Sequence, residues 1–336
     1  MPGRSPTVTC MCTRVVYLGA ADRVVTGRSM DWKYEMSTDL WVLPRGIARS
    51  GAAGEDSLSW TSRYGSVVAS AYGICTADGV NEAGLSANLL WLAESEYPTS
   101  ADGPAMSLTL WAQYVLDNFA SVADAVAALS ASPLVLRTLK VPNEERSATV
   151  HLSMSDATGD SAIVEYVDGH QVIHHDRSYQ AMTNSPIFEK QLAIAEYWKE
   201  IGGTVMLPGT NRAADRFVRA SFYINAIPKT DDPDVSVAAV LSVVRNASTP
   251  YGISTVDEPN ISTTRWRTAF DHKALRYFFE SALAPNTFWV NLKKLNFKAG
   301  APVLKLALGE GEKTVYAGDA SGHFEPAEPF VFQPSV

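Results

Sequence analysis

Apolar and polar residues alternate along much of the first third of the chain, and this two-residue period is typical of strands that bury one face. The pattern predicts strands over 13–17, 23–26, 39–43, 59–73 and 85–92, the first two joined by a turn at 20–22. The segment 77–84 is rich in Asp, Asn and Gly and is expected to be a turn-rich link. The first third is therefore predicted to be nearly all sheet.

The remaining two thirds alternate between helical and strand patterns. Spacings of three and four residues predict helices over 106–118, 121–129, 186–200, 213–227 and from Asp232 or Asp234 to 244. Strands are predicted over 148–154, 162–167, 171–175, 180–183, 265–270, 275–280 and 287–292. Sheets separated by helical groups indicate an α+β protein in which two antiparallel sheets face each other and helices cover both outer faces.

Composition and charge narrow the classes of partner. The 336 residues are 46% apolar, enough for a substantial core, and no linker divides them into two domains. Lys and Arg number 28 against 36 Asp and Glu, with no basic run, so no nucleic-acid partner is expected. No apolar run is long enough to span a membrane. Residues 1–9 lack a signal peptide's apolar stretch, so the sequence as it stands is expected to be cytoplasmic, or periplasmic if a longer leader is removed.

Cys12 is the candidate nucleophile. If the chain is cut after Met11, the new α-amine, with a reference pKa of roughly 7.7 to 8.0, can act as the base for its own thiol. Residues 1–11 would then be a leader or propeptide, removed by self-processing or by loss of Met11 as a true start, and 12–336 the single functional domain. The alternatives are an inert buried cysteine, or a redox or soft-metal pair with Cys10.

Four polar residues are candidates to assist Cys12. The predicted hairpin carries Arg28 and Asp31 back towards it, where a guanidinium favours a thiolate and a carboxylate holds the amine. Asn184, at a strand-to-helix junction, either aims its amide at a developing oxyanion or is an ordinary cap. Arg216 lies within a helix that has an apolar face, where an arginine is usually solvated.

Aromatic and histidine residues are weaker candidates for functional roles. Trp32 and Trp91 either line an acyl pocket or fill core volume. The six His residues are scattered and do not converge on one helix face, so neither a metal site nor a cofactor is expected.

Five motifs occur in the order seen in one enzyme family. They are Cys12-Thr13-Arg14, the run Gly-Arg-Ser-Met-Asp-Trp at 27–32, Ala-Asp-Gly-Val-Asn-Glu-Ala-Gly-Leu at 77–85, Thr183-Asn184-Ser185-Pro186 and Asp215-Arg216-Phe217. From Cys12 to about Leu292 the chain resembles the choloylglycine hydrolases, the family of bile salt hydrolases and penicillin V acylases.

The resemblance implies an N-terminal-nucleophile hydrolase with a four-layer αββα sandwich, which processes itself to expose its cysteine and cleaves linear amides other than peptides. It makes Cys12 both nucleophile and base. Arg28 and Asp31 position these groups, Asn184 contributes to the oxyanion site, and Arg216 supports the network.

The sequence departs from the bile salt hydrolases at two places, one that bears on the substrate and one that bears on the oligomeric state. Trp91 falls where bile salt hydrolases carry Asn; together with Trp32 it resembles the Gram-negative branch, which is similar to penicillin V acylases and cleaves long-chain acyl homoserine lactones. Asn88 or the Trp91 backbone N–H is then expected to be the other oxyanion donor. The family implies a homotetramer, although the segment before Arg216 is shorter than in bile salt enzymes. A bile salt hydrolase, or a non-catalytic binding protein that keeps residues 1–11, are the alternatives to an enzyme for small acyl amides.

Overall fold

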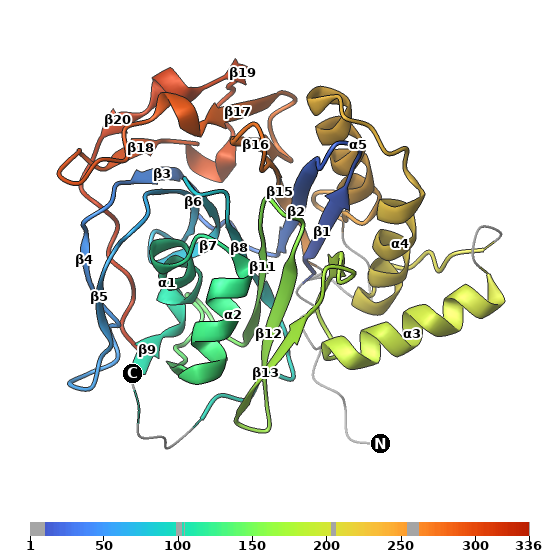
Figure 1. Cartoon of the computed structure of the whole chain (residues 1–336), viewed down its shortest axis with the longest axis horizontal. Helices are drawn as coiled ribbons and strands as arrows, with labels where there is room; N and C mark the ends of the chain where they lie inside the picture. The colour runs from blue at the N-terminus through green and yellow to red at the C-terminus, as the bar shows by residue number, and fades with distance from the viewer. Residues whose placement is uncertain (1–10, 99–102, 104, 203–205, 254–261, 336) are drawn as a thin grey trace.

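Two large sheets lie face to face, with helices on both outer sides, in a computed structural model that describes residues 11–98, 103, 105–202, 206–253 and 262–335 (Figure 1). The first sheet has seven strands, in the order β14 (Ala181–Met182), β1 (Thr13–Leu18), β2 (Val24–Trp32), β15 (Thr263–Asp271), β16 (Arg276–Ser281), β17 (Thr287–Asn291) and β19 (Gly318–Asp319). All neighbours in it are antiparallel except β17 and β19.

The second sheet has nine strands. Their order is β13 (His170–His175), β12 (Ser161–Val167), β11 (Val150–Ser155), β8 (Ser86–Trp91), β7 (Cys75–Asn81), β6 (Ser66–Ala71), β3 (Leu40–Leu43), β18 (Leu304–Leu306) and β20 (Glu325–Pro326). Two small ribbons accompany it, β4 (Ala48–Ser50) with β5 (Ser59–Thr61) and β9 (Ala105–Ser107) with β10 (Val135–Arg137).

Helices cover the outer face of each sheet. On the seven-stranded sheet, α4 (Ala213–Ala226) contacts β1 and β14, α5 (Pro233–Asn246) contacts β1, β2 and β15, and α3 (Phe188–Ile201) packs on α4. On the nine-stranded sheet, α1 (Trp111–Asn118) contacts β7 and β8, and α2 (Val122–Ala131) contacts β12 and β13. Four short 3-10 helices complete the described elements: η1 (Leu108–Leu110), η2 (Leu292–Lys294), η3 (Glu310–Glu312) and η4 (Ser321–His323). The predicted αββα sandwich is confirmed. Among the described helices, none combines the length and apolar content that a membrane span requires.

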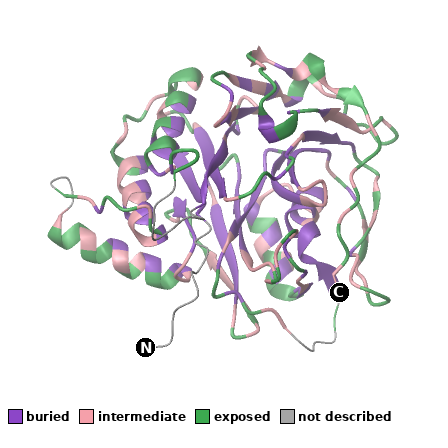
Figure 2. Cartoon of the chain, turned by 180° about the vertical axis from the view of Figure 1, so that it is seen from behind, coloured by how far each residue is buried: buried purple, intermediate pink, exposed green. Residues whose placement is uncertain are grey.

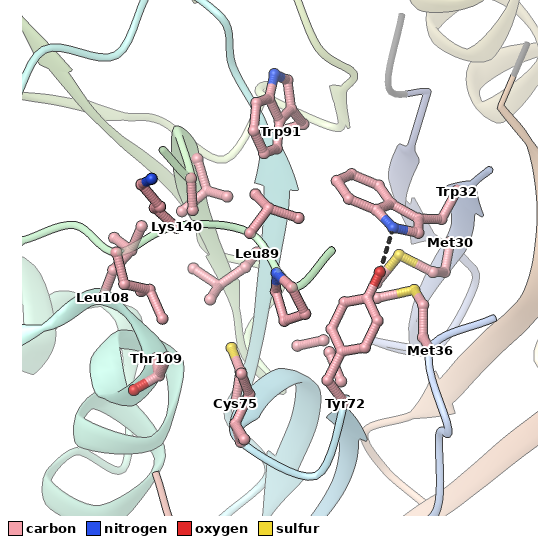
Figure 3. Close-up of a pocket in the computed structure, with 18 of the residues that line it drawn as sticks. Met30, Trp32, Met36, Tyr72, Cys75, Leu89, Trp91, Leu108, Thr109 and Lys140 are labelled. Carbon is pink, nitrogen blue, oxygen red and sulfur yellow. Dashed lines mark hydrogen bonds between the residues drawn. The ribbon is translucent and has the colours of Figure 1, made fainter. Parts of the chain in front are cut away.

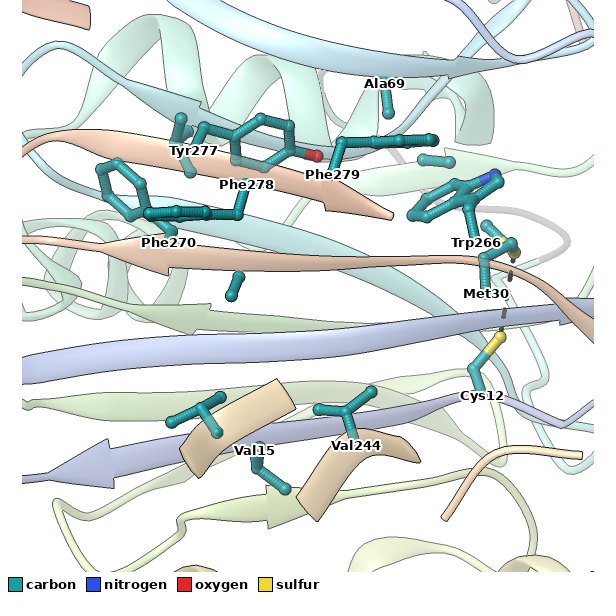
Figure 4. Close-up of a cluster of buried hydrophobic side chains, with 14 of the residues drawn as sticks. Cys12, Val15, Met30, Ala69, Val244, Trp266, Phe270, Tyr277, Phe278 and Phe279 are labelled. Carbon is teal, nitrogen blue, oxygen red and sulfur yellow. Dashed lines mark hydrogen bonds between the residues drawn. The ribbon is translucent and has the colours of Figure 1, made fainter. Parts of the chain in front are cut away.

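The core fills the spaces between these layers, and the central strands of both sheets are buried along their length (Figure 2). Aromatic residues of β15 and β16 dominate the space between the sheets. Trp266 and Phe279 stack there with ring centroids 5.4 Å apart, on the side of Ala69 of the opposite sheet, while Val15 and Val244 lie on the helical side of the first sheet (Figure 4). Cys12 lies at the edge of this cluster.

The expected turn-rich link at 77–84 is wrong for most of its length, because β7 occupies Cys75–Asn81 between β6 and β8. Tertiary contacts explain why small and polar residues occur in this strand. A Cβ on Gly79 would lie 2.7 Å from the Val68 side chain and 2.8 Å from that of Leu116, so glycine lets α1 approach the sheet closely. Asp78 faces an arginine of the other sheet.

Two other boundaries differ from the prediction. The single strand expected over 59–73 is divided into β5 and β6, which belong to different sheets. Gly65 lies in the break, where a Cβ would be 2.4 Å from Phe297. The helix expected over 106–118 begins only at Trp111, because Ala105–Ser107 pairs with β10 and Leu108–Leu110 forms a 3-10 turn. Apolar spacing alone does not separate these conformations.

Candidate active site

Cys12 immediately precedes β1 and is buried between the layers, with 3% of its surface exposed. The register of the β1–β2 hairpin pairs Thr13 with Ser29, which places Cys12 beside Met30. The thiol sulfur lies 3.9 Å from the Met30 sulfur and 4.0 Å from the carbonyl oxygen of Asp31. Met11 is also buried, and in this chain it is still joined to Cys12 by a peptide bond.

Arg28 points from β2 into the space between the sheets. Its Nη2 lies 3.9 Å from the Cys12 sulfur and donates to the Leu89 carbonyl at 2.8 Å, while Nη1 lies 3.4 Å from a carboxylate oxygen of Asp78. The guanidinium also lies over Trp266, 4.8 Å from the ring centroid. Burial raises the pKa of the Cys12 thiol, and the positive charge of Arg28 opposes that rise. The expected effect of Arg28 is therefore present, but burial is the larger influence.

Asp31 is three residues further along β2, so its side chain points to the opposite face of the strand from Arg28. Its carboxylate accepts hydrogen bonds from Thr264 at 2.5 Å and from Ser29 at 3.4 Å. Burial raises the pKa of Asp31 to about 6, against the lowering influence of Arg216. We expected this carboxylate to hold the Cys12 nitrogen, but in the intact chain another residue accepts that hydrogen bond.

Asn184 is that residue: its carboxamide oxygen lies 2.6 Å from the Cys12 backbone nitrogen and 2.7 Å from Arg216 Nη2. Arg216 is completely buried rather than solvated, because its other nitrogens are also used. Nη1 donates to the Cys12 carbonyl at 2.6 Å and to the Thr13 hydroxyl at 2.7 Å, and Nε donates to Asn211. One guanidinium fork thus connects the start of β1 with Asn184.

A buried histidine and glutamate support the segment that carries Asn184. The Nε2 atom of His151, on β11, lies 2.8 Å from the carbonyl oxygen of Thr183. The Nδ1 atom of the same ring lies 3.0 Å from a carboxylate oxygen of Glu165, on β12. Burial raises the pKa of Glu165, but hydrogen bonds from His151 and His174 outweigh it and lower the value to about 2. The segment before Asn184 is therefore fixed from the nine-stranded sheet.

An apolar pocket opens beside Cys12, with about 740 Å³ of space between protein atoms, part of it open to solvent. Trp32 and Trp91 line it together, with ring centroids 5.6 Å apart, and Trp32 donates to the Tyr72 hydroxyl at 2.6 Å (Figure 3). The Arg146 guanidinium lies over both rings, 4.2 Å from Trp91 and 5.5 Å from Trp32. The two tryptophans are therefore pocket residues and not only core filling.

Trp91 also presents its backbone to the site. The carbonyl oxygens of Leu89 and Trp91 accept from Arg28 and Asn184, at 2.8 and 2.7 Å. Because a strand residue directs its N–H and C=O to the same side, the Trp91 N–H points to this edge too, beyond the last β7–β8 pair at Asn88. The Asn88 side chain is instead bonded to Asp78 at 2.7 Å and to Ser153 at 3.3 Å, and it is not part of the pocket lining.

The sequence did not single out Asp78, Thr264 or Arg146, which contact the predicted residues. Asp78 was within reach, because it belongs to the 77–85 motif, but that motif was assigned to a turn. Thr264 and Arg146 carry no local signal, since their partners lie far away in the chain. Within the described part of the chain no cluster of three metal-ligating side chains is found, and Cys10 lies outside that part.

Comparison with known proteins assigns the family. Residues 12–305 match the family described as linear amide C–N hydrolases, choloylglycine hydrolase family. This chain belongs to the choloylglycine hydrolase family. The match begins at Cys12, the residue that the sequence nominated as nucleophile.

Individual relatives of this chain include penicillin V acylases and bile salt hydrolases. It is 55% identical to a penicillin V acylase of Pectobacterium atrosepticum, over 97% of this chain and 93% of that protein. The structure of a penicillin V acylase from Agrobacterium tumefaciens is 56% identical and superimposes with a TM-score of 0.89, over 96% of this chain and 99% of the other. A bile salt hydrolase/transferase of Clostridium perfringens is 24% identical, over 81% of this chain and 89% of that protein. The chain is therefore a linear amide C–N hydrolase, and bile salt hydrolases are distant relatives.

Proposed function

We propose that Cys12 becomes the N-terminal residue of the mature enzyme, after removal of residues 1–11, and that its thiol and α-amine act together. The observation that carries this proposal is the arrangement at Cys12, where the thiol faces the pocket and the backbone nitrogen is held by Asn184 at 2.6 Å. Once freed, that nitrogen is an amine next to the thiol. Residues 12–336 then form one functional domain.

In the proposed reaction the α-amine takes the thiol proton and the Cys12 thiolate adds to the amide carbonyl carbon. The C–N bond breaks as the leaving amine takes a proton from the α-ammonium group. Water, losing a proton to the α-amine, then hydrolyses the thioester and releases the acid and the thiol. Arg28 favours the thiolate, whereas Arg216 fixes the Cys12 carbonyl and Asn184.

We assign the oxyanion site to Asn184 and to the Trp91 backbone. Asn184 Nδ2 donates one hydrogen to the Trp91 carbonyl and carries a second. The Trp91 N–H points to the same edge of β8, beside the Leu89 carbonyl that Arg28 contacts. Donors fixed before the substrate arrives stabilise a developing negative charge without reorganisation. The Asn88 side chain is less suited, because Asp78 and Ser153 already engage it.

The substrate we propose joins an apolar acyl group to a small polar amine: penicillin V, a long-chain N-acyl homoserine lactone, or both. The pocket lining supports the acyl part, since Trp32, Met36 and Leu89 are among its apolar side chains. The similarity to penicillin V acylases supports the class. Bile salts are the alternative substrate, with less support because the bile salt enzymes are only 22 to 24% identical.

The deciding experiment compares hydrolysis of penicillin V, N-dodecanoyl homoserine lactone and glycocholate by one preparation whose intact mass is measured. We expect a mass that begins at Cys12 and kcat/KM at least about tenfold higher on the first two substrates than on glycocholate. Preference for glycocholate would assign a bile salt hydrolase. A chain that keeps residues 1–11 and binds these amides without cleaving them would be a binding protein.

Cys12→Ala is the matched variant for this experiment. It removes the sulfur from a residue that is already small and buried, and it is expected to lower kcat by at least roughly a thousandfold. If processing is self-catalysed, this variant also keeps residues 1–11. We further propose a homotetramer, as the family resemblance implies, which light scattering of the processed protein tests directly.

A further inference from the structure

The acyl pocket has a wall on the side away from the nucleophile, formed by Ile74, Cys75, Leu108 and Thr109, which we name the far wall. In Figure 3, Cys75, Leu108 and Thr109 lie across the cavity from Met30, whose sulfur is 3.9 Å from the Cys12 thiol. An acyl group attacked at Cys12 therefore directs its free end towards the far wall.

The two halves of the far wall come from separate segments. Ile74 lies in the turn between β6 and β7, and Thr109 lies in η1. Gln333 connects them through its backbone: its N–H donates to the Ile74 carbonyl at 3.1 Å, and its carbonyl accepts from Ser107 at 2.7 Å and Thr109 at 3.0 Å. A single residue near the C-terminus thus joins both halves from behind.

Residues 330–335, which we name the C-terminal strap, are anchored on both sides of Gln333. Phe330 packs on Trp41 with ring centroids 5.2 Å apart and on Phe332 at 4.7 Å. The Arg49 guanidinium lies 5.3 Å from the Phe332 ring centroid. On the other side, the Ser335 N–H donates to the Ala52 carbonyl at 3.0 Å. The strap is therefore built into the fold, and it lies beyond residue 305, where the family match ends.

We propose that the C-terminal strap sets the depth of the acyl pocket, by holding Ile74 and Thr109 together through Gln333, and so makes the enzyme discriminate between acyl groups by length. The inference is an extension of the proposed function. Packed interiors transmit a loss of support as a shift of the atoms that were supported. Removing the strap lets the far wall recede while Cys12, Arg28 and Asn184 keep their contacts.

The test uses two variants that weaken the strap by removing contacts of Gln333 and two that leave the Gln333 contacts in place; of the latter, truncation after Pro334 gives up the Ser335 contact to Ala52. Truncation after Phe332 removes Gln333. Ser107→Ala removes one hydrogen bond to Gln333 together with the 3.0 Å hydrogen bond between the Ser107 and Thr109 hydroxyls, and Ser107 itself does not line the pocket. Truncation after Pro334 and Val331→Ala, at a side chain that is 78% exposed, are the controls. Each protein is assayed with N-hexanoyl and N-dodecanoyl homoserine lactone, which share a leaving group.

We expect the ratio of kcat/KM for the dodecanoyl substrate to kcat/KM for the hexanoyl substrate to rise about tenfold in the truncation after Phe332. This factor is the lower end of the discrimination that one methylene group gives in an apolar pocket. Ser107→Ala should change it in the same direction by a smaller factor, and the controls should match the parent. Ratios within about twofold of the parent in both weakened variants would overturn the proposal. If the truncated protein does not fold, Ser107→Ala decides.

Cys75 provides a readout that does not depend on catalysis. It lies in the far wall, so its alkylation by N-ethylmaleimide, followed by peptide mass spectrometry, reports how far the wall has opened. Faster alkylation of Cys75 in the weakened variants, in a protein that cleaves no amide, would support the strap and refute the proposed function. Unchanged alkylation with unchanged selectivity in an active enzyme would refute the strap and leave the proposed function standing.

Discussion

Asn184 and Cys12 are joined by a 2.6 Å hydrogen bond from backbone nitrogen to carboxamide oxygen, across 172 residues of sequence. The nitrogen that we propose as the catalytic base is therefore already positioned while it is still part of a peptide bond. Arg216 completes the arrangement by contacting Asn184 and the Cys12 carbonyl. Removing residues 1–11 would release an amine into a site that is preformed around it.

Arg216→Lys is expected to lower kcat by about 100-fold, the cost of a small misplacement of reacting groups. Lysine keeps the charge but cannot reach the Cys12 carbonyl, Thr13 and Asn184 at once, because it lacks the planar fork. Steady-state kinetics on penicillin V measures the loss. Arg219→Lys, on the same helix and hydrogen-bonded to the carbonyls of Pro208 and Thr210 in the loop before it, is the control and should retain activity. Equal activity of the two variants would contradict the proposed role.

Thr264→Val is expected to move the acidic limb of the pH profile of kcat/KM to higher pH, by roughly one unit. The pKa of Asp31 is raised to about 6 by burial, so activity that needs the carboxylate is present above this pH and lost as pH falls through it. The Thr264 hydroxyl stabilises the carboxylate, and removing it raises the pKa further. Thr263→Val is the control, because the bond to Asp31 comes from Thr264 and not from this adjacent residue, and it should leave the acidic limb in place. An acidic limb that stays in place in Thr264→Val would show that Asp31 does not control it.

Asp31→Asn is expected to stabilise the fold near neutral pH. The Asp31 pKa rises from 3.8 to about 6 on burial, so the folded protein holds a proton that the unfolded chain has lost between these values. The free energy of unfolding therefore falls as pH rises through this window. Asparagine removes that penalty, giving a gain of about 1 to 3 kcal/mol near neutral pH and none below about pH 4. Urea unfolding at several pH values measures it, with Asp22→Asn in an exposed turn as control.

Asp78→Asn is expected to shift the pH dependence of Cys12 alkylation by iodoacetamide to lower pH. Asp78 lies 3.4 Å from Arg28 and partly neutralises it, so the amide leaves more positive charge beside the thiol and lowers the thiol pKa. Asp117→Asn removes another buried carboxylate, paired with Arg49 away from the site, and should leave the profile unchanged. A shift to higher pH in Asp78→Asn would mean that Arg28 acts through position and not through charge.

The sequence by itself determined the local elements and the first part of the site. Alternation of apolar residues predicted β1, β3, β8, β15, β16 and β17, and helical spacing predicted α2, α4 and α5, close to their observed bounds. The Cys12–Arg28 relationship could be predicted because both residues belong to one hairpin, in which alternation and turn chemistry act over a few residues.

Only the tertiary structure decided how the site is completed. Residues of the 77–84 segment favour turns locally, yet pairing on both sides and the close approach of α1 make most of it a central strand, with Asp78 directed at Arg28. Asn184 and Arg216 reach Cys12 because β14 and α4 pack against β1. Such contacts depend on which elements pair and on which face of its element each side chain lies. A local period of two or 3.6 residues does not specify either of these.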